Sequence, residues 1–183
     1  MRSRAMRAIR RGAVAGVTAA LLPVAAGAQS AKAAPALDDA AIVGIFDAAN
    51  SWDIATGKLA SERASREAVK SFGAMLARDH AGVQQQGRDL AAKLGVTPTP
   101  VGADFALRKN HEQAMAKLSG LSGAAFDKAF LEHEVAFHQA VIDAVTTTFL
   151  PAIQNAELRA FVTKVAPAFE AHLKQAEILL KGL

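Results

Sequence analysis

The residues of this chain that could carry chemistry are its five histidines and the acidic residues near them. His80, His133 and His172 fall on the apolar lines of three predicted helices, at the three- and four-residue spacing of a buried face. His138 lies one position off such a line, on the same helix face as Glu134 four residues earlier. Neutral imidazole and carboxylate groups together suit a divalent transition metal such as iron, zinc or copper.

Counting residues from the predicted turns indicates which side chains share a level. His133 and His172 are nearly equidistant from the turn between the last two helices, at about 1.5 Å of rise per residue. The same count places His80 within two turns of Asn50 and Asp53 on the first helix. We therefore expect polar groups from several helices to gather in one layer of an apolar core.

Two interpretations of this layer remain open. The first is a metal site, and its candidate ligands are Asp79, His80, Glu134, His138 and His172. The second is a buried hydrogen-bonded layer that holds no ligand and fixes the helix register. The spacing favours the second, because carboxylate di-iron bundles need Glu-x-x-His on two helices and this chain has none. His111 lies in a connecting segment among charged residues, and we expect it to be exposed.

Composition excludes several other kinds of site. The chain has no cysteine, so it cannot form disulfides, thiolate metal sites or a thiol nucleophile. No serine-hydrolase, zinc-protease or phosphate-binding motif occurs, and we predict no catalytic and no cofactor-binding residues. With no tyrosine and one tryptophan, the chain also offers few aromatic platforms for stacking nucleic-acid bases.

The N-terminal segment has the pattern of an export signal. Residues 1–11 carry five arginines and no acid, residues 12–26 are uncharged, and Ala26-Gly27-Ala28 has the small-residue form of a cleavage site. We predict a signal peptide over 1–28, a flexible lead-in over 29–36 and one domain over 37–183. An uncleaved membrane anchor is the alternative, although the apolar stretch is short for a span. Arg10-Arg11 leaves both the Sec and the twin-arginine routes open.

Removal of the signal changes the charge of the protein. The signal carries five of the 21 basic residues and none of the 17 acidic ones, which leaves 16 basic against 17 acidic residues. A near-neutral domain has no electrostatic attraction to nucleic acid, so we expect no nucleic-acid partner. The signal predicts a periplasmic or otherwise exported protein.

Apolar spacing predicts helices almost everywhere after residue 37. The first begins at Asp38 or Asp39 and is weakened at Gly57, and the second begins at a Ser65 cap and ends at Gly95. A shorter helix follows in the connecting segment.

The second half of the chain predicts two more long helices. One starts near residue 122 and is closed by Pro151, and the last is capped by Asn155 and kinked or broken at Pro167. Tight turns make two antiparallel hairpins of the four long helices, whereas residues 95–122 separate the hairpins. We predict an all-α fold, a ferritin-like four-helix bundle with a long crossover carrying a short extra helix over 104–119.

Several short stretches are similar to a bacterial family known as domain-of-unknown-function family 4142. They are Ala48-Ala49-Asn50, Gly57-Lys58-Leu59-Ala60, Val69-Lys70-Ser71-Phe72, Asp79-His80, Phe126-Asp127, residues 133–138, Pro167 and His172-Leu173. The resemblance covers residues 37–181. It implies an exported ferritin-like protein, often labelled an outer-membrane protein, without an established activity. It also marks Asp79, His80, His138 and His172 as positions to test.

These observations leave two main functional hypotheses. The first is a non-enzymatic periplasmic bundle that acts in envelope maintenance or stress, with an envelope protein as partner. The alternative is a metal-binding redox or sequestration protein that uses the mid-bundle histidines and carboxylates. Neither hypothesis sets the oligomeric state.

The helix over 104–119 suggests a third, weaker hypothesis, peripheral contact with a membrane. Its Arg108, Lys109 and Lys117 could face anionic lipid. The simpler interpretation is that this helix covers one end of the bundle.

Overall fold

The computed structural model describes residues 37–183, which form helices joined by loops. The helices are α1 (Asp39–Arg63), α2 (Glu67–Leu94), α3 (Ala106–Ser119), α4 (Gly123–Ala144), the π-helical turn η1 (Val145–Phe149), α5 (Leu150–Ala152) and α6 (Ala156–Lys181). No strand occurs in this part of the chain, so the prediction of an all-α protein is confirmed there. The predicted signal peptide and lead-in, residues 1–36, lie outside the described residues.

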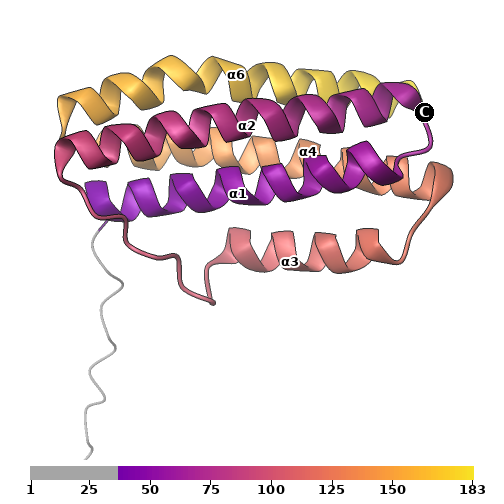
Figure 1. Ribbon diagram of the computed structural model, residues 1–183, viewed down its shortest axis with the longest axis horizontal. Coiled ribbons are helices and arrows are strands. Elements are labelled where there is room, and N and C mark those ends of the chain that lie inside the picture. The colour runs from indigo at the N-terminus through magenta and orange to yellow at the C-terminus, as the bar shows by residue number, and fades with distance from the viewer. Residues whose placement is uncertain (1–36) are drawn as a thin grey trace, which may run out of the picture. The chain divides into compact units, whose positions relative to one another are not determined.

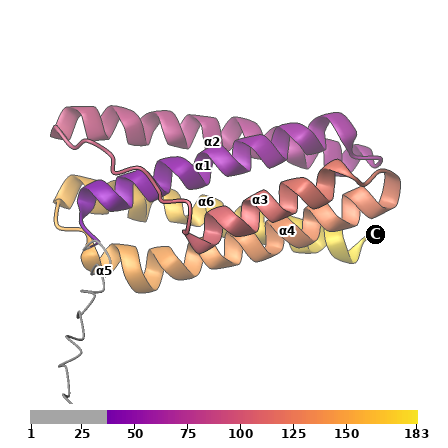
Figure 2. The ribbon, with the colours of Figure 1, turned by 90° about the horizontal axis from the view of Figure 1, so that it is seen from below.

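The four long helices α1, α2, α4 and α6 lie side by side (Figures 1 and 2). A short turn joins α1 to α2 as a hairpin, and η1 and α5 lead from α4 into α6. Between the hairpins, residues 95–122 run back along the molecule, so that α2 and α4 start at the same end (Figure 1). This connection carries α3, as predicted. However, α3 lies along α4 and α1 and does not cover an end of the molecule (Figure 2).

Side-chain caps mark the starts of α1 and α6. Asp38 caps α1 and Asn155 caps α6, as predicted, each accepting hydrogen bonds from backbone amides of the first turn. The prediction that Ser65 caps α2 is wrong. The backbone amides of Ser65 and Arg66 instead donate to the carboxylate of Asp127 on α4, at 2.7 and 2.9 Å. Asp127 therefore ties the start of α2 to α4.

Two glycines allow α1 and α2 to approach closely. A Cβ on Gly57 would lie 2.6 Å from the carbonyl oxygen of Gly73, and a Cβ on Gly73 would lie 2.7 Å from the carbonyl oxygen of Gly57. A larger residue at either position would push the backbones apart. Gly57 does not end α1, which continues to Arg63 beside the turn expected from the sequence. The contact lies about one turn beyond Asp53, so it sets how α1 faces α2 at that level.

Pro151 and Pro167 do not end a helix at their own positions. Pro167 lies inside α6, which is continuous across it, so the break that the sequence suggested is absent. A proline removes one hydrogen bond, here to the carbonyl of Thr163, and Pro167 is exposed, so water can replace that bond. Pro151 lies within α5, which ends one residue later at Ala152.

Two of the three basic residues of α3 pair with nearby acids. Arg108 Nε lies 2.8 Å from Glu112 Oε1, and Lys109 Nζ lies 2.9 Å from Asp104 Oδ1. These pairs leave less free positive charge for a lipid surface than the sequence alone suggested. Within residues 37–183, no helix combines the length and the apolar character that crossing a bilayer requires.

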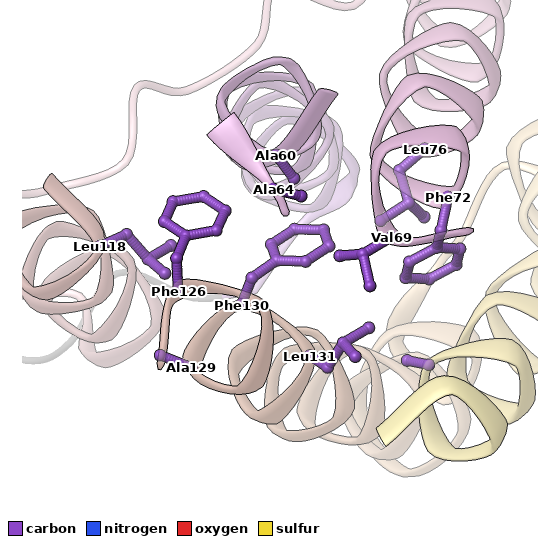
Figure 3. Packing of buried hydrophobic residues seen from close by; sticks show 11 residues of the cluster. Ala60, Ala64, Val69, Phe72, Leu76, Leu118, Phe126, Ala129, Phe130 and Leu131 are labelled. Atoms are coloured by element: carbon purple, nitrogen blue, oxygen red, sulfur yellow. The ribbon is translucent and has the colours of Figure 1, made fainter. Parts of the chain in front are cut away.

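Apolar clusters fill the interior toward both ends of the long helices. In the Phe130 cluster, Phe126 and Phe130 project from α4 toward Ala60 of α1 and Ala64, which follows α1 (Figure 3). The full Phe130 cluster is Ala60, Ala64, Val69, Phe72, Leu76, Leu118, Phe126, Ala129, Phe130, Leu131 and Ala176. The Ile42 cluster is Ile42, Val43, Ala91, Val145, Phe149, Ile153, Leu158 and Val162. A different kind of side chain occupies the level between them.

Candidate metal centre

A buried polar layer lies between the two apolar clusters. On each long helix its residues fall, in sequence order, between members of the Ile42 cluster and members of the Phe130 cluster. They are Asn50 and Asp53 on α1, His80 on α2, Glu134 and His138 on α4, and His172 on α6. None is more than 6 % exposed, so bulk water does not solvate these groups.

Three histidines from three helices converge in this layer. The ligand nitrogens of His80, His138 and His172 all lie within 4.8 Å of one another. The ring centroids are 5.1 to 5.6 Å apart. Two nitrogens on one metal ion are at most about 4.2 Å apart, because each metal–nitrogen bond is about 2.1 Å long. Small side-chain rotations would therefore bring this set to coordination distance.

Two carboxyl groups adjoin the histidines. Asp53, Glu134 and His138 also offer ligand atoms within 4.8 Å of one another, so His138 belongs to both sets. Asp53 Oδ2 lies 3.5 Å from His80 Nε2, and Glu134 Oε2 lies 3.4 Å from His138 Nδ1. Together Asp53, His80, Glu134, His138 and His172 form one continuous set of nitrogen and oxygen ligands, here called the His–carboxylate group.

The tautomer of His80 is set by Asn50. The side-chain nitrogen of Asn50 donates to the carbonyl oxygen of Phe46 at 2.8 Å, which leaves Asn50 Oδ1 as an acceptor. His80 Nδ1 lies 2.9 Å from that oxygen, so Nδ1 carries the hydrogen. The lone pair of neutral His80 is therefore on Nε2, the nitrogen nearest Asp53.

The other two histidines are held in the same manner. His138 Nδ1 donates to the backbone carbonyl oxygen of Glu134 at 3.0 Å, which leaves its lone pair on Nε2. His172 Nε2 lies 3.4 Å from Asp79 Oδ2, which leaves its lone pair on Nδ1. One ring nitrogen donating to an oxygen and the other free to ligate is the usual arrangement of a metal-binding histidine.

Several buried atoms of this group have no hydrogen-bond partner among the described residues. They are Asp53 Oδ1, His80 Nε2, both carboxyl oxygens of Glu134, His138 Nε2 and His172 Nδ1. An unsatisfied buried polar group costs about 1–3 kcal/mol, and native proteins contain few of them. A layer that only fixed helix register would be expected to satisfy these atoms internally.

Burial favours the neutral form of His80 and His172. Burial, with smaller contributions from the neighbouring His138 and His172, lowers the pKa of His80 to about 3. Burial also lowers the pKa of His172, with a smaller contribution from His138. Because only neutral imidazole ligates a metal ion, both side chains are ready to bind one at neutral pH.

The two carboxyl groups respond to their surroundings in opposite ways. Burial, followed by the charge of Glu134, raises the pKa of Asp53. Burial alone would raise the pKa of Glu134, but the His138 side chain, whose Nδ1 lies 3.4 Å from Glu134 Oε2, outweighs it and lowers that pKa to about 2. Among the described residues, neither carboxyl group pairs with a lysine or arginine. A divalent cation would balance the buried negative charge of Glu134.

The structure brings together four of the five predicted ligands. Asp79 is the exception: its side chain is 35 % exposed, and it contacts His172 from the outer side. Adjacent residues on a helix diverge by about 100°, so Asp79 and His80 cannot face the same point. Asp53 occupies the inner position instead. Its place on the apolar face of α1, three residues after Asn50, was the signal that could have identified it.

His133 and His111 lie outside the group. His133 is five residues from His138, a rotation of about 140°, so the two rings face different neighbours. The shared level expected for His133 and His172 therefore does not bring them together. His111 is 8 % exposed, which contradicts the expectation that it is solvated. Its ring stacks on Trp52 at 5.7 Å and lies 6.2 Å from that of His133.

Comparison with known proteins gives a family and no activity. The family model described as a domain of unknown function, DUF4142, matches residues 24–179. No curated protein matches the chain. No solved structure matches it either. Since the family model spans most of the sequence, the chain belongs to the DUF4142 family.

Proposed function

We propose that this is an exported, periplasmic protein with a ferritin-like four-helix bundle that binds a divalent transition metal ion, such as iron, zinc or copper. The observation that carries the proposal is the convergence of three buried histidines from α2, α4 and α6. Each presents an unpartnered nitrogen, and each is fixed through its other nitrogen. The bound ion would be held by His80, His138 and His172, with Glu134 and Asp53 as oxygen ligands.

The chemistry of these ligands narrows the choice of ion. Imidazole nitrogens suit iron, zinc, copper and nickel, whereas magnesium and calcium prefer sites made of oxygen alone. The chain offers no thiolate, which removes sites built on sulfur from cysteine. We propose metal binding as the function and assign no catalytic role to any residue.

The arrangement of the helices supports the ferritin-like part of the proposal. The two hairpins are joined by a long connection, so α2 and α4 run in the same direction (Figure 1). This connectivity is that of bundles with one crossover, in which metal ligands project inward from facing helices. The ligands differ here, because histidines outnumber carboxylates and no Glu-x-x-His pair occurs.

Export is proposed from the N-terminal pattern. The basic start, the uncharged stretch and Ala26-Gly27-Ala28 predict that the mature protein begins at Gln29. Mass spectrometry of the protein recovered from a periplasmic fraction would check this start. Intact chain in the inner-membrane fraction would contradict it.

Metal-dependent thermal unfolding tests the binding proposal. The mature protein is stripped with a chelator and melted with Zn²⁺, Co²⁺, Cu²⁺ or no metal. A ligand that binds only the folded state at 100 times its dissociation constant stabilises it by about 2.7 kcal/mol, so at least one ion should raise the melting temperature by several degrees.

A matched pair of variants on α4 makes this test specific. His138→Ala removes a proposed ligand, whereas His133→Ala removes a histidine of the same helix that lies outside the His–carboxylate group. The melting shift should disappear in the first variant and persist in the second. Equal shifts in the two variants, or no shift in the wild-type protein with any ion, would contradict metal binding at this site.

A further inference from the structure

A pocket of about 250 Å³ lies against one side of the His–carboxylate group. Its walls come from α1, α2, α3, α4, η1 and α6, and its lining includes Asp53 and His80, two of the five proposed ligands. Asn50, which sets the tautomer of His80, also lines it. The pocket therefore reaches the proposed metal site from the side where α3 packs on the long helices.

Exposure along the lining shows how the pocket connects to solvent. Ala106 and Asn110 on α3, and Ala140 on α4, are exposed. Asp53 and His80, at the other extreme, are 3 % and 2 % exposed. The lining thus passes from solvent-exposed residues between α3 and α4 to fully buried ligands. It provides a route by which a small molecule could reach the interior.

The π-helical turn η1 forms part of the wall. The backbone amide of Leu150 donates to the carbonyl oxygen of Val145, five residues earlier, instead of the usual four. Such a turn inserts one extra residue into a helix, and π-helical turns are frequent at functional sites. Both Val145 and Phe149 line the pocket, so the irregular turn shapes its inner surface.

The lining selects for an uncharged molecule. Among the described residues, the only ionisable side chains that line the pocket are those of Asp53 and His80, both at its buried end. Phe46, Phe105 and Phe169 contribute aromatic surface to the walls. A charged ligand would lose its hydration here without gaining a partner of opposite charge along the walls.

We propose that this pocket binds a small, uncharged and mostly apolar molecule and directs its single polar donor atom, such as a hydroxyl or carbonyl oxygen, toward the bound metal ion. An apolar cavity of about 150 Å³ is large enough for benzene, so this pocket accommodates one aromatic ring with substituents. The donor-atom part of this inference rests on the proposed function, whereas occupation of the pocket by an apolar ring does not.

Phenol and benzene are matched probes for the test. Both rings fit the pocket, but only phenol has an oxygen that can reach the metal. In the metal-free mature protein, both should bind and shift the methyl NMR signals of Val145 and Leu107, two lining residues. In the Co²⁺-loaded protein, phenol should change the visible absorption of the ion and benzene should not.

Variants on α4 test whether binding occurs in this pocket. Ala144→Phe fills the interior, and Ala140→Phe obstructs the exposed rim without disturbing the buried core. Ala136→Phe is the control, since Ala136 is exposed on the same helix and does not line the pocket. Each lining variant should weaken benzene binding about tenfold or more, which is about 1.4 kcal/mol, and the control should leave it unchanged.

The outcomes separate this inference from the proposed function. Absence of benzene and phenol binding in a protein that binds Co²⁺, or equal weakening by all three variants, would overturn the pocket while leaving metal binding intact. Phenol binding that leaves the Co²⁺ spectrum unchanged would overturn the claim that the pocket directs the donor atom of its ligand toward the metal ion. If Co²⁺ does not bind but benzene does, with the expected variant effects, the proposed function fails and the apolar pocket stands.

Discussion

The Phe130 cluster and the His–carboxylate group lie on the same long helices and are equally buried. They differ in that the first contains only apolar side chains, whereas the second contains polar atoms without hydrogen-bond partners within residues 37–183. Phe126, Phe130 and Leu131 are 0 % exposed and present only apolar surface to one another (Figure 3). Glu134, one turn further along α4, is also 0 % exposed, but both its carboxyl oxygens lack a hydrogen-bond partner among the described residues. One turn of α4 thus separates an apolar part of the core from a buried polar part.

This difference has an energetic meaning. Burial of apolar side chains stabilises the fold by about 25 cal/mol per Å² of surface removed from water. Burial of unpartnered polar atoms opposes folding by about 1–3 kcal/mol for each group. We infer that the Phe130 cluster holds the helices together, and that the His–carboxylate group is retained for what it binds. Substitutions in the two regions should therefore affect stability with opposite signs.

The largest effect is expected in the apolar region. Phe130→Ala should lower the free energy of unfolding by about 3–5 kcal/mol, because it removes a buried ring and leaves a cavity. Urea denaturation of the metal-free protein measures this loss. The folded fraction should keep its metal stoichiometry, since Phe130 lies outside the His–carboxylate group. A loss of less than about 1 kcal/mol would show that the cluster is not well packed.

Substitution of the Glu134–His138 pair should act in the opposite direction. Replacing Glu134 by Met and His138 by Leu together exchanges two buried polar side chains 3.4 Å apart for apolar ones, a kind of change that often stabilises a protein by about 1–4 kcal/mol. The metal-free variant should resist urea better than the wild type, while its affinity for metal falls. Reduced stability would mean that the pair is satisfied in the folded protein and contributes to the fold.

An intermediate effect is expected for the partner that orients His80. Asn50→Ala removes the acceptor for His80 Nδ1 but leaves every proposed ligand in place. Loss of such an outer partner typically weakens metal binding by about 10–100-fold. Competition with a chromophoric chelator would measure the change. Unchanged affinity would indicate that His80 does not ligate the ion through Nε2.

Per unit of pH, the pH dependence of stability should show the smallest effect. The pKa of His80 is about 3 in the folded protein and 6.5 in the unfolded reference, so between these values the unfolded chain binds a proton that the folded protein does not. The free energy of unfolding should fall as the pH drops through this window. The contribution of this one histidine reaches about 1.4 kcal/mol per pH unit.

A variant isolates that contribution. His80→Leu should have a shallower dependence of stability on pH than the wild type below pH 6.5, measured by urea denaturation in the presence of a chelator. Parallel pH profiles for the two proteins would show that the lowered pKa of His80 is not linked to folding.

The helices and their caps could be predicted because they depend on neighbouring residues. Apolar spacing fixed the faces of the long helices, and Asp38 and Asn155 cap the amides of their own first turns. The cap of α2 could not be found in this way, because the Asp127 carboxylate, which accepts a hydrogen bond from the Arg66 amide, lies 61 residues further along the chain. Contacts of that range depend on how the helices are placed side by side.

The candidate site was predictable to a similar extent. His80 and His172 were identified by their place on apolar lines, and Glu134 and His138 by their shared face. The inner position of Asp53 was indicated by its place on the apolar face of α1, but the close approach of α1 to α2 at Gly57 is not revealed by spacing along one helix. The burial of His111 depends on Trp52, which belongs to another helix.

X-ray absorption spectroscopy, combined with elemental analysis of protein isolated from its own cells, tests the central claim most directly. The account predicts about one transition metal ion per chain, with three imidazole ligands at about 2.0–2.1 Å. Replacing His80, His138 and His172 together should remove both the metal and the imidazole signal. Protein that carries less than about a tenth of an equivalent, and gains none when incubated with iron, zinc or copper, would contradict the account.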